Sequence, residues 1–157
     1  MNTSNNTLPI AYTFPRHILL ADDDEDDCLL FKDALDELLV SGKFSCVSNG
    51  EKLMQLLADS KLLPDFIFLD MNMPRKSGLQ CLLEIKANAS LKDIPVVILS
   101  TSFEPNMMER LYENGAQLCL KKPNEFTKLK EAIHSALSLA EQAPALDKAA
   151  VVSQPSN

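Results

Sequence analysis

Five polar residues follow short apolar runs of this 157-residue chain, and their side-chain types together suit the binding of a phosphoryl group. They are two adjacent aspartates, a third aspartate, a serine and a lysine: Asp22, Asp23, Asp70, Ser100 and Lys122. Three carboxylates supply hard oxygen ligands, which favour Mg²⁺. Like charges ~4 Å apart repel by about 4 kcal/mol at an effective dielectric of about 20, so such a cluster needs a divalent cation or a proton. A lysine and a hydroxyl beside that metal complete a site for phosphoryl chemistry.

Asp70 is the candidate for the reacting group. It ends the run FIFLD between Pro64 and Pro74, which is typical of a strand buried on both faces of a parallel sheet. Ligands of open parallel sheets bind beyond the carboxyl ends of the strands. The chain has no Gly-rich phosphate cradle, which leaves a carboxylate as the acceptor of an acyl phosphate. Taken alone, Asp70 fits a capping acid on a solvated turn better, so the interpretation depends on the other four residues.

Apolar periodicity and turn residues predict five strands that alternate with five helices. We expect the strands at 17–21, 43–48, 65–70, 96–99 and 117–120, and the helices to begin near Asp24, Asn49, Ser77, Pro105 and Glu125. The first helix is expected to end at Ser41-Gly42 and the last near residue 140. This alternation predicts an α/β fold with a doubly wound parallel sheet of flavodoxin-like strand order 2-1-3-4-5. In that order the five polar residues meet at one rim of the sheet.

The chain is expected to hold one domain, residues 17–140, between a flexible leader (1–16) and a disordered tail (141–157). The net charge of −7 argues against nucleic-acid binding, which needs a basic surface. No apolar run approaches the length of a membrane span, and no signal peptide precedes the domain. We therefore expect a cytoplasmic protein.

The four cysteines are widely spaced, without a CxxC pair or a nearby histidine: Cys28, Cys46, Cys81 and Cys119. We interpret all four as reduced core residues, and a zinc site is not expected.

The acids after Asp24 (Glu25, Asp26 and Asp27) occupy a helix start, where the macrodipole favours negative charge. We interpret these three as solvated side chains.

Four segments occur in the order and spacing of a known family: LLADDDEDD, FLDMNMPRKSG, PVVILSTS and GAQLCLKKP. On these segments the chain resembles the CheY-like response-regulator receiver domains of two-component signal transduction, over about residues 17–140. The resemblance implies that Asp70 is phosphorylated and that Mg²⁺ is bound by Asp23 and Asp70, with Asp22 nearby or acting through water. The backbone carbonyl of Asn72 would be a further ligand.

The resemblance also implies that Ser100 is the switch hydroxyl and that Lys122 pairs with the phosphate. One position departs from the family, which commonly has Tyr or Phe three residues before the lysine, where this chain has Cys119. Phosphorylation does not need the aromatic ring. With Cys119 in its place, however, the sequence does not predict how the Ser100 hydroxyl is coupled to the rest of the domain, or which surface contacts the downstream protein. The face of the fourth helix, fifth strand and fifth helix is our candidate.

The resemblance implies that a histidine kinase or a phosphotransfer protein donates the phosphoryl group and that the protein acts on an unknown downstream protein. We expect the chain to be a monomer or a weak homodimer. The tail is too short and too poor in apolar residues for a DNA-binding domain, so we expect a stand-alone receiver. We expect no enzyme activity beyond its own phosphorylation and dephosphorylation. One alternative is a Mg²⁺-dependent phosphohydrolase, although Asn72 stands where such enzymes have a second acid and no cap insertion is present. The other is a non-phosphorylated pseudo-receiver, which would lack the acids or the lysine.

Overall fold

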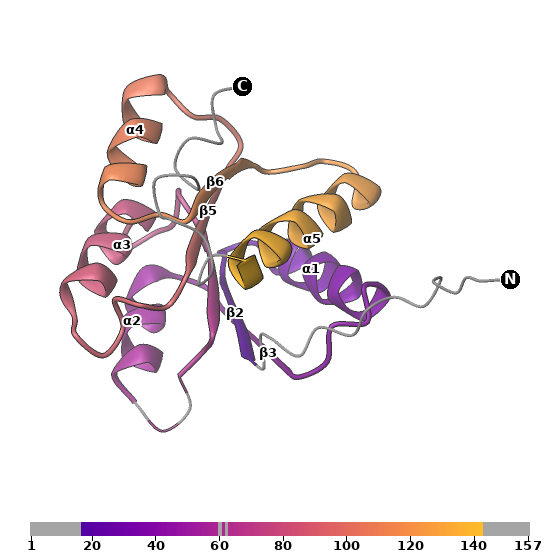
Figure 1. Ribbon diagram of the computed structural model, residues 1–157, viewed down its shortest axis with the longest axis horizontal. Coiled ribbons are helices and arrows are strands. Elements are labelled where there is room, and N and C mark those ends of the chain that lie inside the picture. Colours follow the sequence, from indigo (N-terminus) through magenta and orange to yellow (C-terminus); the bar gives the residue numbers. More distant parts are fainter. Residues whose placement is uncertain (1–16, 60, 62, 143–157) are drawn as a thin grey trace, which may run out of the picture.

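The computed structural model describes residues 17–142 apart from positions 60 and 62, and within these ranges strands and helices alternate (Figure 1). The strands are β2 (His17–Ala21), β3 (Lys43–Val47), β4 (Phe66–Asp70), β5 (Val96–Ser100) and β6 (Leu118–Lys121). The helices are α1 (Glu25–Glu37), α2 (Gly50–Ala58), α3 (Gly78–Ala87), α4 (Pro105–Glu113) and α5 (Phe126–Gln142). The predicted leader, and the predicted tail beyond Gln142, lie outside the described residues.

The strands form one parallel sheet in the order β3-β2-β4-β5-β6. Counted along the described chain this is the order 2-1-3-4-5, so the predicted flavodoxin-like α/β fold is confirmed. Helices α1 and α5 cover one face of the sheet, and α2, α3 and α4 cover the other (Figure 1). The two central pairs are in register to their ends, with Ala21 beside Leu69 and Asp70 beside Leu99. Their carboxyl ends therefore open onto the same rim.

The sheet separates two apolar cores. Successive side chains of a strand point to opposite faces, so Leu19 of β2 packs towards α2 and α3, whereas Ile18 and Leu20 pack towards α1 and α5. All five residues of β2, of β4 and of β5 are buried. This explains why their sequences are continuous apolar runs rather than alternating ones, as predicted.

Most helix starts fall where the sequence predicts them. The side chains of Asp24, Asn49 and Ser77 each accept a backbone N–H from the first turn of the following helix. The end of α1 differs from the prediction, because the helix stops at Glu37 rather than near Gly42. Leu39 has a φ of 60°, and this left-handed residue ends the helical path early.

The prediction of four reduced cysteines is wrong for two of them. Cys28 of α1 and Cys46 of β3 form a disulfide, with their Cα atoms 6.3 Å apart. Cys81 and Cys119 are free and buried, as predicted. No local motif indicates this pair, because the packing of α1 against β3 brings the two cysteines together.

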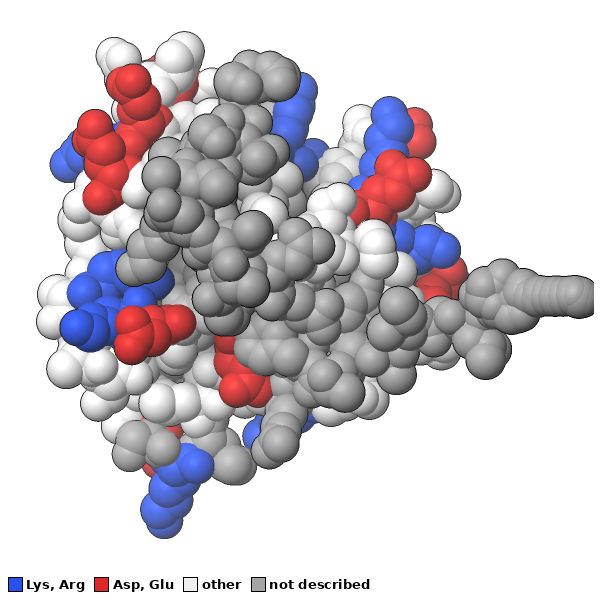
Figure 2. Space-filling view, viewed as in Figure 1, with Lys and Arg blue, Asp and Glu red and all other residues white. Residues whose placement is uncertain are grey.

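None of the helices in the described ranges is long and apolar enough to cross a membrane. Acidic and basic side chains lie in mixed groups on the visible face in Figure 2.

Candidate functional site

Three aspartates meet at the carboxyl rim of the sheet. Asp22 and Asp23 directly follow β2, and Asp70 is the last residue of the neighbouring strand β4. One carboxylate oxygen from each lies within 4.8 Å of the others. Asp22 and Asp70 are only 2% and 5% exposed, whereas Asp23 is exposed to solvent. The three side chains that the sequence predicts as metal ligands are thus brought together in a group that can hold a metal ion.

Each buried carboxylate is fixed through both of its oxygens. Oδ1 of Asp22 accepts the N–H of Asp24 at 2.9 Å, and Oδ1 of Asp70 accepts the N–H of Asn72 at 3.2 Å. Their Oδ2 atoms face the Nζ of Lys122 at 2.9 and 3.3 Å. Asn72 thus lies beside Asp70, and metal binding by its carbonyl stays a prediction.

Lys122 reaches this group from the loop after β6, and a fourth acid shares it. Oδ2 of Asp27 lies 3.0 Å from Lys122 Nζ, so the interpretation of Asp27 as a solvated side chain is wrong. The missed signal is geometric: side chains in a helix tilt towards its N-terminus, and the first turn of α1 begins at the rim. The N–H of Lys122 also donates to the carbonyl of Ser100 at 2.7 Å, which joins the ends of β5 and β6.

Burial dominates the electrostatics of the two inner acids. It raises the pKa of Asp22 to about 6 and moves the pKa of Asp70 in the same direction, although backbone N–H groups and Lys122 partly oppose both changes. Burial also works to lower the pKa of Lys122, but hydrogen bonds to Asp22 and Asp27 and the charge of Asp70 outweigh it, so the pKa rises. The site therefore holds excess negative charge in a place where water stabilises it poorly.

Ser100 ends β5 at the same rim and is almost fully buried. Its hydroxyl donates to the carbonyl of Ser102 at 2.7 Å, so in this structure the hydroxyl is engaged by its own loop. The sequence therefore places Ser100 correctly, beside Lys122 and near Asp70.

Gly78 fixes the loop that follows Asp70. Its N–H donates to the carbonyl of Met71 at 2.9 Å, and a Cβ at this position would lie 2.7 Å from the carbonyl oxygen of Asp70. Such a contact is shorter than packing permits, so α3 approaches the Asp70 loop this closely only because residue 78 has no side chain.

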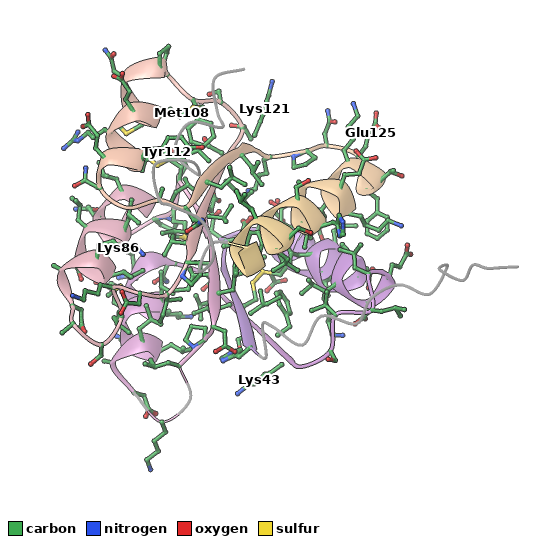
Figure 3. All side chains as sticks on the ribbon, viewed as in Figure 1. Lys43, Lys86, Met108, Tyr112, Lys121 and Glu125 are labelled. Carbon is green, nitrogen blue, oxygen red and sulfur yellow. A yellow bond between two sulfur atoms is a disulfide. The ribbon has the colours of Figure 1, made fainter. Side chains whose placement is uncertain are left out.

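Cys119, at the position where the resemblance leads us to expect an aromatic residue, is buried in β6. Its N–H donates to the hydroxyl of Tyr112 at 3.0 Å, and Figure 3 labels this tyrosine on α4, whose neighbour is β6. An aromatic side chain thus does contact this strand, but it comes from the helix.

Comparison with known proteins agrees with this site. Residues 18–134 match the sequence profile of the response regulator receiver domain. The chain belongs to this family. The resemblance noted from its four segments is confirmed, and with it a place in two-component signal transduction, which implies a histidine kinase as partner. Members of this family are generally not conventional enzymes.

Two curated relatives show how far the similarity extends. The response regulator Rcp1 of Synechocystis is 33% identical over 113 residues, which are 69% of this chain and 77% of Rcp1. The two-component response regulator ORR3 of Oryza sativa is 32% identical over 100 residues, or 62% of this chain and 76% of ORR3.

Two solved structures share both fold and sequence with the chain. The Mn²⁺-bound form of Rcp1 has a TM-score of 0.72 at 30% identity and covers 79% of this chain and 93% of its own. The phosphorylated cyanobacterial phytochrome response regulator RcpA has a TM-score of 0.70 at 30% identity, with coverage of 81% and 92%. These relatives have thus been seen with a divalent metal and in a phosphorylated form.

Proposed function

We propose that the chain is a cytoplasmic phosphoacceptor in which a histidine kinase or a phosphotransfer protein places a phosphoryl group on Asp70. The observation that carries this proposal is the buried Asp70 carboxylate at the end of β4, 3.3 Å from Lys122 Nζ and within 4.8 Å of the two other acids. Asp22, Asp23, Asp70 and the carbonyl of Asn72 would hold Mg²⁺.

The acid group fits such a metal. Its ligands are carboxylate oxygens, which suit Mg²⁺ and Mn²⁺, and the relative Rcp1 was crystallised with Mn²⁺. The raised pKa values of Asp22 and Asp70 indicate that their negative charge is poorly balanced by Lys122 alone. Bound Mg²⁺ would supply positive charge that offsets the acids and the phosphoryl oxygens.

The reaction needs only the Asp70 carboxylate as nucleophile. One of its oxygens forms a bond to the phosphorus of a donor phosphohistidine while the P–N bond breaks. The imidazole nitrogen keeps the electron pair of that bond and takes a proton from water. Lys122 stays within reach of the new phosphoryl oxygens, and its raised pKa keeps it charged. Water later cleaves the acyl phosphate, which releases phosphate and restores Asp70.

Ser100 would convert the new charge into a change of shape. Its hydroxyl now donates to the carbonyl of Ser102, and a phosphoryl oxygen on Asp70 would compete for that hydrogen. When Ser100 turns, the loop between β5 and α4 loses this hydrogen bond and can adopt a second conformation. We propose that the face formed by α4, β6 and α5 then contacts a downstream protein.

Intact-mass measurement after incubation with acetyl phosphate and Mg²⁺ tests the proposal. We expect one phosphoryl adduct on the native chain, none on Asp70→Asn, and an unchanged adduct on the control Asp33→Asn, which removes an exposed acid of α1. No adduct under saturating donor and metal would favour a binding module instead. Turnover of an external phosphomonoester would favour a phosphohydrolase, against which Asn72 offers an N–H to Asp70 rather than a second carboxylate.

A further inference from the structure

A second group of reactive atoms lies beside the acid site. The disulfide of Cys28 and Cys46 lines an open pocket of about 400 Å³, together with Asp22, Asp23, Val47 and Lys52. Both cysteines are partly exposed to solvent. A small thiol in this pocket can therefore approach the disulfide from the same side as the acid group.

The disulfide joins the two segments that position Asp22. On the β3 side, Cys46 precedes Val47, whose carbonyl accepts the N–H of Asp22 at 3.0 Å. On the α1 side, the sulfur of Cys28 lies 3.9 Å from the carbonyl oxygen of Asp22. The chain between Asp22 and Cys28 also contains Asp23. The disulfide and the hydrogen bond from Asp22 to Val47 therefore hold both ends of the loop that carries two of the three acids.

The other two cysteines differ from this pair in burial and in the reactivity of their thiols. Cys81 and Cys119 are buried, and burial raises the pKa of Cys81 to about 11 and that of Cys119 to about 12. Thiols of this kind react slowly because the thiolate is the reactive form. Oxidation is thus directed to the pair at the pocket.

The fold has other contacts that hold α1 to β3 when the bond is absent. β3 pairs with β2 along all five of its residues, and the rings of Phe31 and Phe44 stack with centroids 5.7 Å apart. Phe31 of α1 also packs on Phe68 of β4, with centroids 4.8 Å apart. Reduction is therefore compatible with a folded domain.

We propose that Cys28 and Cys46 are a reversible redox pair, exchanging with low-molecular-weight thiols and disulfides, that sets the metal affinity of the neighbouring acid group. The regulatory part rests on the proposed function, because a cytoplasmic phosphoacceptor works where disulfides are usually transient. The exchange itself does not depend on phosphorylation.

The exchange has two balanced steps. One cysteine thiolate attacks a small disulfide, forms a mixed disulfide and releases one small thiolate. The second cysteine thiolate then attacks the protein sulfur of that mixed disulfide and releases the other. The two protein thiols lose two electrons and two protons in total, and the small disulfide becomes two thiols. Reduction is the reverse, with the small thiol as the electron donor.

The oxidised state is expected to favour the metal. In the structure the disulfide is closed and the three acids already lie within 4.8 Å of one another, so the ligands are arranged before the ion arrives. Reduction removes the covalent link between the first turn of α1 and β3 and lets Asp22 and Asp23 separate, while the packing of Phe31 on Phe44 and Phe68 keeps the rest of the helix on the sheet. Changes around metal ligands commonly alter affinity by about tenfold or more, which is the effect expected here.

The exchange can be tested on the native chain in buffers with graded ratios of reduced to oxidised glutathione. After acid quenching, alkylation in denaturant and intact-mass measurement should count four blocked thiols at the reducing end and two at the oxidising end. Peptide mapping should assign the difference to Cys28 and Cys46. A count that does not change over the whole range, or a change at Cys81 or Cys119, would overturn the proposal.

The coupling is tested by calorimetric titration of Mg²⁺ into the oxidised and reduced native protein. We expect the oxidised form to bind about tenfold more tightly and the reduced form to match Cys28→Ser. Cys46→Ser serves as a second variant, and the reduced native chain needs no substitution. Equal affinities of the two forms would overturn the coupling. If exchange and affinity behave as expected but neither form is labelled by acetyl phosphate, the redox pair stands and the proposed function fails.

Discussion

Replacing Asp22 by asparagine should stabilise the metal-free protein, although the substitution removes a 2.9 Å ion pair with Lys122. Burial raises the pKa of Asp22 from 3.8 to about 6, even with Lys122 opposing the change. A difference of about two pKa units corresponds to about 3 kcal/mol. The ionised carboxylate therefore lowers the free energy of unfolding by that amount near neutral pH, and the neutral amide of Asp22→Asn avoids the loss.

The predicted gain depends on pH in a defined way. Below pH 3.8 the carboxyl group is protonated in both folded and unfolded chains, so it does not favour either state. Between pH 3.8 and about 6 the unfolded chain ionises first, which lowers the stability of the native protein as the pH rises. The full difference of about 3 kcal/mol is reached above that interval, and Asp22→Asn should lack this part of the pH dependence.

Urea denaturation in the presence of EDTA, followed by circular dichroism at about pH 4 and about pH 7, measures both quantities. Asp33→Asn on the exposed side of α1 is the matched control and should change stability little. Saturating Mg²⁺ should reduce the advantage of Asp22→Asn, because the native carboxylate then has a cation beside it. A variant less stable than the native chain at about pH 7, or a gain of equal size at both pH values, would refute the dominance of burial over the Lys122 ion pair.

Three further predictions concern the surroundings of the site. Gly78→Ala should lower the free energy of unfolding by about 1–3 kcal/mol in urea titrations and slow phosphorylation by acetyl phosphate, because its Cβ would lie 2.7 Å from the Asp70 carbonyl oxygen. Tyr112→Phe should cost about 1 kcal/mol and speed amide hydrogen exchange at Cys119, whose N–H loses its 3.0 Å acceptor. Cys81 and Cys119 should resist iodoacetamide at about pH 8 in the folded chain and react in urea, as mass spectrometry can show, since burial raises their pKa values to about 11 and 12.

The sequence was sufficient for the sheet and most of the site, because both depend on rules that act along the chain. A short continuous apolar run between prolines, such as Phe66–Leu69, is typical of a strand covered on both faces, and the residue after it then lies at the carboxyl rim. Parallel pairing of β2 with β4 brings Asp22 to Asp70 once the strand order is known. The caps of α1, α2 and α3 are equally local.

What the sequence did not predict depends on how separate elements pack. The pairing of Asp27 with Lys122 requires the first turn of α1 and the loop after β6 to lie at the same rim, and no local pattern encodes this. The disulfide forms because α1 lies beside β3. Cys28 and Cys46 are 18 residues apart and share no motif, so the sequence does not indicate that they pair. The early end of α1 depends on Leu39, a residue type that rarely takes a positive φ and so gives no stop signal.

The division of the interior by the sheet bears on how this protein can change over evolutionary time. The two cores share no member among the described buried residues, so a substitution under α1 and α5 meets different neighbours from one under α2, α3 and α4. Effects of substitutions at sites without common partners usually add. Each covering layer of helices can therefore diverge with few compensating changes in the other. The proposed contact face takes α4 from one layer and α5 from the other, so its two halves can change separately while the strand ends keep the same acids and lysine.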